Sequence, residues 1–146
     1  MNETPYIHDD GGRQQAGFKG STGDCVCRAI AIATAKPYAE VYDALNDTQA
    51  AMRQTKRVRG SSSRTGVARP VYEHYLRSLG WKFVPCMTIG SGCQVHLKST
   101  ELPSGRIICR LSRHLCTVID GVIHDTHDPS RDGTRCVYGY YVESGN

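Results

Sequence analysis

The stretch "HLCTVIDGVIHD" at residues 114–125 constrains the fold more than any other part of this chain. Asp-Gly between two alternating apolar runs is the strongest short-range signal for a β-hairpin. A two-residue turn at Asp120 and Gly121 would place Ile119 opposite Val122 and continue this register along both strands. We therefore predict two adjacent antiparallel strands late in the chain.

The predicted hairpin brings an imidazole close to a carboxylate. Asp125 lies diagonally across from His114, close enough to accept a hydrogen bond from the ring and to orient it. Asp128 is the alternative partner, because a one-residue bulge would exchange the two carboxylates. Since side chains alternate between the faces of a sheet, the face that carries this pair comprises His114, Cys116, Val118, Ile123, Asp125 and His127.

The rest of the sequence predicts an α+β fold in which helices come first and strands follow. Apolar residues at helical spacing indicate helices that open at Cys25 and at Pro37, and a third helix over 70–80. From residue 82 onward, short β-branched or aromatic runs alternate with Gly, Ser and Pro, which is typical of strands. We predict a single domain over 1–146, with an antiparallel sheet packed on three helices and with 1–22 as an extended lead-in.

Composition excludes several classes of protein. No apolar run reaches the roughly 18 residues that cross a bilayer, so we expect no membrane span. The first residues are polar and partly acidic, unlike a secretory signal, which predicts a cytoplasmic location. The chain has 7 cysteines. An odd number without an export signal argues against a disulfide framework and predicts that most of them are reduced.

Cys25 is the cysteine to which we assign a chemical role. In "GDCVCRAIAIAT", Asp24 is a good N-cap and Cys25 takes the first position of a buried helix. The free N–H groups and the dipole at a helix start favour the thiolate, which is the nucleophilic form. Cys27 is interpreted as a packing residue, and the same core role is predicted for Cys86, Cys93, Cys109, Cys116 and Cys136.

Two kinds of site can be drawn from these residues. A thiolate at Cys25, an imidazole at His114 and a carboxylate at Asp125 would form a catalytic triad. The alternative is a zinc site with four ligands, Cys25, Cys27, His124 and His127. Two features argue against it: Cys-x-Cys is an unusual spacing for zinc ligands, and the two histidines fall on opposite faces of the predicted hairpin. We therefore predict no metal and no other cofactor.

A basic segment follows the second predicted helix. Its cationic residues are Arg53, Lys56, Arg57, Arg59, Arg64 and Arg69. Such a segment can bind phosphates, but here no aromatic residues are interleaved to stack on bases. We interpret it as a solvated helix end and loop rather than as a nucleic-acid site.

Four stretches together resemble papain-like cysteine peptidases, particularly the compact C39-like group: "GDCVCRAIAIAT", "KPYAEVYDAL", "MTIGSGCQVHL" and "RHLCTVIDGVIHDTHDPSR". They are also similar to a family of small uncharacterised proteins encoded by bacteriophages and prophages, from about Gly17 to Tyr141. The resemblance implies a papain-like fold with Cys25 as nucleophile, His114 as general base and acid, and Asp125 as the orienting residue. It implies a protein or peptide substrate and, if a phage encodes the chain, a location in the cytoplasm of the host cell.

One position departs from the papain-like pattern. Such enzymes commonly place a glutamine about six residues before the nucleophile to bind the oxyanion, whereas this chain has Lys19 there. Gln14 or Gln15 would have to take that role, or the Cys25 N–H would act with another donor. Because a fold does not settle function, the alternative is a non-catalytic phage protein that binds a host protein on the same scaffold.

Overall fold

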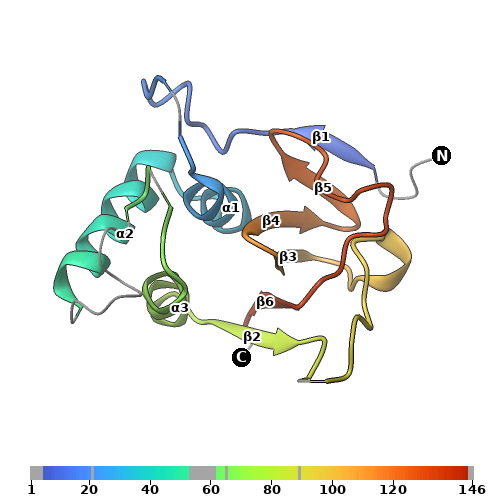
Figure 1. The fold of residues 1–146 in the computed structure, drawn as a ribbon. Helices are drawn as coiled ribbons and strands as arrows, with labels where there is room; N and C mark the ends of the chain where they lie inside the picture. Colours follow the sequence, from blue (N-terminus) through green and yellow to red (C-terminus); the bar gives the residue numbers. More distant parts are fainter. Residues whose placement is uncertain (1–4, 21, 53–61, 65, 89, 145–146) are drawn as a thin grey trace.

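The computed structural model describes residues 5–20, 22–52, 62–64, 66–88 and 90–144, and it places three helices on one side of a six-stranded sheet (Figure 1). The helices are α1 (Cys25–Thr34), α2 (Tyr38–Ala51) and α3 (Arg69–Ser78), and a short 3-10 helix is η1 (Ser99–Glu101). The strands are β1 (Tyr6–His8), β2 (Trp81–Pro85), β3 (Arg106–Leu111), β4 (His114–Ile119), β5 (Val122–Asp125) and β6 (Gly139–Glu143). The predicted α+β class and its three helices are confirmed.

The predicted hairpin is β4 and β5. Ile119 lies opposite Val122 and Thr117 opposite His124, which is the register that the turn at Asp120 requires. Asp120 has a φ of 49° and Gly121 a φ of 81°. Two successive positive φ values are the geometry of the type I′ turn for which Asp-Gly is favoured. The hairpin prediction is therefore confirmed in position and in register.

The sheet is mixed, so the prediction of a purely antiparallel sheet was wrong. Its strand order is β1-β5-β4-β3-β6-β2, and β1 pairs with β5 in parallel, with Tyr6 opposite Ile123. This strand lies inside 1–22, which was interpreted as an extended lead-in. It is three residues long. That is too short to show an alternating pattern, and its backbone pairing with a distant strand leaves no local signal.

The helix that carries Cys25 is buried on almost every side. All its residues from Val26 to Ala33 are buried, because it has apolar residues around its whole circumference. It packs against β4, where the hydroxyl of Thr117 donates a 2.6 Å hydrogen bond to the carbonyl of Ala29. No helix in the described ranges is long and apolar enough to cross a membrane.

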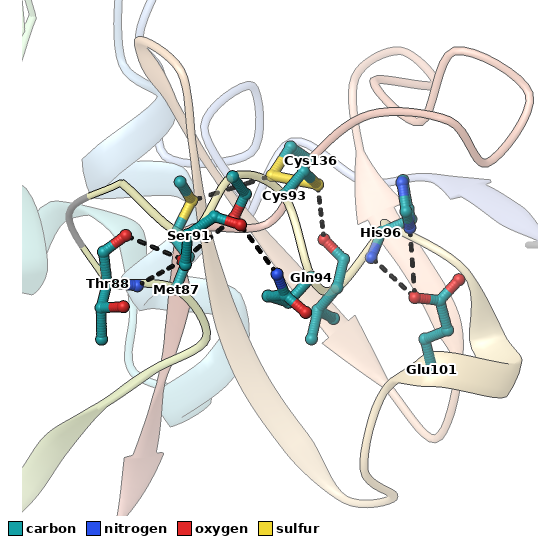
Figure 2. Close-up of a disulfide and its surroundings, with 10 residues drawn as sticks. Met87, Thr88, Ser91, Cys93, Gln94, His96, Glu101 and Cys136 are labelled. Carbon is teal, nitrogen blue, oxygen red and sulfur yellow. Dashed lines mark hydrogen bonds and ion pairs between the residues drawn. A yellow bond between two sulfur atoms is a disulfide. The ribbon is translucent and has the colours of Figure 1, made fainter.

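The other side of the sheet is covered by the long connections that hold η1 and that precede β6 (Figure 1). A disulfide between Cys93 and Cys136 joins these two connections, and the sulfur of Met87 lies 3.9 Å from that of Cys136 (Figure 2). The core role predicted for these two cysteines was therefore wrong, because loops from distant parts of the chain bring them together. A strand predicted around residues 93–98 is also absent there, and a single bridge pairs His96 with Cys136.

The remaining cysteines follow the prediction more closely. Cys27, Cys109 and Cys116 are free and buried in the core, as predicted. Cys86 is free but only half-buried, and it packs against the core from one side.

The cytoplasmic location expected from the sequence stays a prediction.

Gly139→Ala is expected to destabilise the fold, because Gly139 stands where β6 passes close to β2. An added Cβ would overlap the ring of Phe83 and would lie 2.7 Å from the carbonyl oxygen of Val84. Forced overpacking of this kind costs about 1–3 kcal/mol in the free energy of unfolding, measurable by urea denaturation. The matched control Glu143→Ala, on an exposed position of the same strand, should change stability by less than about 0.5 kcal/mol. Equal stability of the two variants would contradict the described packing.

Candidate active site

Three elements bring Cys25, His114 and Asp125 together. Cys25 is the first residue of α1, His114 is the first residue of β4, and Asp125 is the last residue of β5. Because β4 and β5 form a hairpin, the first residue of β4 and the last residue of β5 both lie at the open end of the hairpin, opposite its turn. Helix α1 packs along β4, and Cys25, the first residue of α1, lies beside the same end of the hairpin.

The expected contact between the imidazole and the carboxylate is present. Nε2 of His114 lies 2.6 Å from Oδ2 of Asp125, which is only 1% exposed. The ring of His114 also lies close enough to the thiol of Cys25 for each group to shift the pKa of the other, and Nδ1 is the ring nitrogen that Asp125 leaves available to the thiol. The alternative carboxylate, Asp128, is exposed and accepts the backbone N–H of Ser130 at 2.9 Å. The structure therefore places Asp125 in the position predicted for the orienting residue.

Asp125 has hydrogen-bond donors on both of its oxygens. Oδ2 is bound to His114, while Oδ1 accepts Nη2 of Arg28 at 2.8 Å and the N–H of Thr126 at 2.7 Å. Burial alone would raise the pKa of Asp125. The hydrogen bond and charge of His114, together with Arg28 and the Thr126 N–H, outweigh burial and hold the pKa of this carboxyl below its ordinary value.

Arg28 is the residue of this site that sequence reasoning missed. Its Nη1 lies 2.5 Å from Oδ1 of Asp24, so one guanidinium joins Asp24 to Asp125. Tyr38 donates its hydroxyl to Oδ2 of the same Asp24 at 2.7 Å. The spacing of Asp24 and Arg28, four positions apart on a helix, was a visible signal for the first of these ion pairs. The second ion pair crosses to a distant strand and had no signal.

The carboxylate of Asp24 does not cap α1, so the predicted capping role was wrong. Asp24 occupies the N-cap position, but its side chain makes no capping hydrogen bond with the first turn. Arg28 and Tyr38 engage both carboxylate oxygens instead. A guanidinium forms a stronger bond with a carboxylate than a backbone N–H does, because both partners are charged.

The site favours a thiolate at Cys25 and an imidazolium at His114. Burial would raise the pKa of Cys25, but hydrogen bonds from His114 and from the Leu115 N–H, with the charges of His114 and Arg28, bring it below its ordinary value. Burial would lower the pKa of His114, but the hydrogen bonds and charges of Asp125 and Cys25 raise it to about 9. Each group therefore stabilises the charged form of the other.

The thiol and the imidazole both line an open cavity of about 790 Å³. Its walls come from the segment before α1, the start of α3 and the turn between β3 and β4. Gln14, Gln15 and Lys19 are exposed and do not line this cavity. Neither glutamine therefore stands where the papain-like pattern needs an oxyanion donor.

A metal ion fits this site poorly. Ligand atoms of His114, Asp125 and His127 lie within 4.8 Å of one another, and this is the one such group among the described residues. Both oxygens of Asp125 are already engaged, and the guanidinium of Arg28 would repel a cation. A cation would have to displace those bonds before it gained a carboxylate ligand.

The four residues weighed as zinc ligands are not gathered. Cys27 lies in the core with its sulfur 3.9 Å from the Tyr38 carbonyl, and burial raises its pKa to about 12. His124 lies 3.1 Å from a carboxylate oxygen of Asp9. Two of the proposed ligands are therefore engaged away from Cys25.

Most of the basic segment, including Arg53, Lys56, Arg57 and Arg59, lies outside the described residues. Arg64 is exposed and donates to the carbonyl of Lys19 at 3.2 Å. Arg69 begins α3 and lines the cavity beside Cys25.

Comparison of the chain with family models, with curated proteins and with solved structures gave no match. The resemblance to papain-like peptidases accordingly stays a prediction.

Arg28→Met is expected to lower the free energy of unfolding by about 3–5 kcal/mol, because it leaves two buried carboxylates without their cation. Urea denaturation at neutral pH measures the loss. Arg77→Met, which removes an exposed arginine from α3, should change stability by less than about 0.5 kcal/mol. A loss at Arg28 no larger than that at Arg77 would show that the buried ion pairs do not hold the fold.

Cys25 should react with iodoacetamide at pH 7 at least about tenfold faster than Cys86, the other half-buried free cysteine. The pKa of Cys25 is lowered, so its thiolate forms at lower pH, whereas burial raises the pKa of Cys86. Peptide mass spectrometry after timed labelling from pH 5 to 10 gives both curves. His114→Ala should shift the Cys25 curve to higher pH, since it removes a hydrogen bond and a positive charge. Equal rates for the two cysteines at pH 7 would contradict the lowered pKa of Cys25.

Proposed function

We propose that this protein is a cysteine hydrolase that cleaves an amide bond, in a peptide or an isopeptide, through a covalent acyl-enzyme on Cys25. One observation carries the proposal. A thiol at the start of a buried helix lies beside an imidazole that is held by a buried carboxylate of lowered pKa, and both the thiol and the imidazole line one cavity. This is the arrangement of nucleophile, base and orienting group that activates a cysteine.

In the first half of the reaction, the Cys25 thiolate forms a bond from Sγ to the substrate carbonyl carbon, and the carbonyl oxygen becomes an oxyanion. The backbone N–H groups in the first turn of α1 would donate hydrogen bonds to this oxyanion, and the positive end of the helix dipole would stabilise its charge. The imidazolium of His114 gives its proton to the leaving nitrogen as the carbon–nitrogen bond breaks. The products are a thioester on Cys25 and a free amine.

In the second half, neutral His114 takes a proton from a water molecule as its oxygen adds to the thioester carbon. The carbon–sulfur bond then breaks, the substrate leaves as a carboxylic acid, and the thiolate–imidazolium pair is restored. Asp125 keeps its charge throughout and holds the ring in place. Its role is orientation and stabilisation of the imidazolium.

The papain-like comparison belongs to this proposal. It is supported by the order of a buried helix that begins with the thiol, two further helices, and a sheet that supplies the imidazole and the carboxylate. The proposed partner is a protein or peptide substrate, and the cytoplasm is the proposed location.

Acetylation by p-nitrophenyl acetate tests the proposal without knowledge of the natural substrate. We expect a burst of p-nitrophenolate, with one acetyl group located on Cys25 by mass spectrometry, and slow turnover afterwards. Cys25→Ala should give no burst. His114→Ala should slow turnover by about 10²–10⁴-fold, because it removes the general base that activates water.

Circular dichroism of each variant must match that of the parent chain for the comparison to hold. Acetyl groups spread over lysines and other cysteines, or equal rates in the parent chain and Cys25→Ala, would contradict the proposal. Either outcome would favour a non-catalytic binding protein on this scaffold.

A further inference from the structure

The cavity beside Cys25 is rich in positive charge. Arg28, Arg69, Arg110 and Arg113 all line it, whereas Asp24 is the only carboxylate among its described lining residues. Wherever a cavity collects one sign of charge, ligands of the opposite sign are concentrated in it. What the cavity binds therefore depends on which of these guanidinium groups are already neutralised.

Two of the arginines are paired within the protein. Arg28 lies between Asp24 and Asp125, as described above. Arg69 lies 3.1 Å from a carboxylate oxygen of Glu73, which also accepts the hydroxyl of Tyr141. Each of these two guanidinium groups is therefore already paired with a carboxylate of the protein.

Arg110 and Arg113 are different, because neither forms an ion pair with any residue in the described ranges. The guanidinium of Arg110 lies over two aromatic rings, 5.8 Å from the centre of Phe83 and 5.7 Å from that of Tyr138. Such stacking holds a guanidinium in place while its N–H groups stay available at the edge. Arg113 is exposed in the turn between β3 and β4, directly before His114.

We infer that this cavity selects an acidic peptide, with Arg110 and Arg113 binding a carboxylate that lies within a few residues of the cleaved amide. Guanidinium groups bind carboxylates through paired N–H donors, which gives direction as well as affinity. The inference rests on the proposed function, because a thiolate that attacks an amide requires an acyl substrate. A peptide supplies both the amide and the carboxylate, whereas a nucleic acid supplies only the negative charge.

The ratio of two alkylation rates at Cys25 tests the charge of the cavity. Iodoacetate is anionic and iodoacetamide is neutral, and both react with the same thiolate, so their ratio cancels any change in thiolate fraction. Arg110→Gln and Arg113→Gln should each lower the iodoacetate-to-iodoacetamide ratio by about two- to threefold at low salt. Arg77→Gln makes the same change in net charge on the exposed surface and should leave the ratio unchanged. Arg113 is itself exposed, so its variant is informative even if Arg110→Gln disturbs β3.

An unchanged ratio in both cavity variants would overturn the inference. This failure is distinguishable from failure of the proposed function, which would appear as slow iodoacetamide labelling of Cys25 in the parent chain. The two readouts come from the same samples.

Protection of Cys25 tests the class of ligand. A blocked peptide of alternating glycine and glutamate should slow iodoacetamide labelling at least about threefold at low salt, and its counterpart with glutamine should not. The protection should be lost in Arg110→Gln/Arg113→Gln. Equal protection by both peptides would overturn the role of the carboxylate. Protection by single-stranded oligothymidylate without protection by the acidic peptide would overturn the inference in favour of a nucleic acid.

Discussion

The two ion pairs of Arg28 are the interaction on which the site depends. One guanidinium binds Asp24 at the start of α1 and Asp125 at the end of β5, so it fixes the helix that carries the thiol to the strand that carries the acid. Asp125 in turn holds His114, and the position of the imidazole relative to Cys25 follows from the same contact. Burying three charges is costly, and this arrangement is stable only because each charge is paired and hydrogen-bonded.

The same cluster sets the charges of the reacting groups. Arg28 helps keep Asp125 ionised, Asp125 and Cys25 together raise the pKa of His114 to about 9, and His114 in turn lowers the pKa of Cys25. At each step, the charge of one group shifts the pKa of the neighbouring group. The structural role and the chemical role of this cluster are therefore not separable.

What could be predicted from the sequence was local. The turn at Asp120 fixed the register of β4 and β5, and with it the meeting of His114 and Asp125. The apolar circumference of α1 predicted a buried helix that begins at Cys25. The parallel pairing of β1, the ion pair of Arg28 with Asp125 and the disulfide of Cys93 with Cys136 all join distant segments. No periodicity or spacing along the chain records such contacts, because they arise only once the sheet has formed.

The misassigned role of Asp24 bears on how an oxyanion would be bound. A carboxylate that capped α1 would occupy the first-turn N–H groups and would repel a developing negative charge at the same place. Here Arg28 and Tyr38 hold the Asp24 carboxylate away from those groups, and no side-chain cap replaces it. In the proposed mechanism, the helix start can then serve the substrate. This matters because Gln14, Gln15 and Lys19 lie outside the cavity, and in the proposed mechanism the backbone N–H groups at the start of α1 take the role of a glutamine side chain.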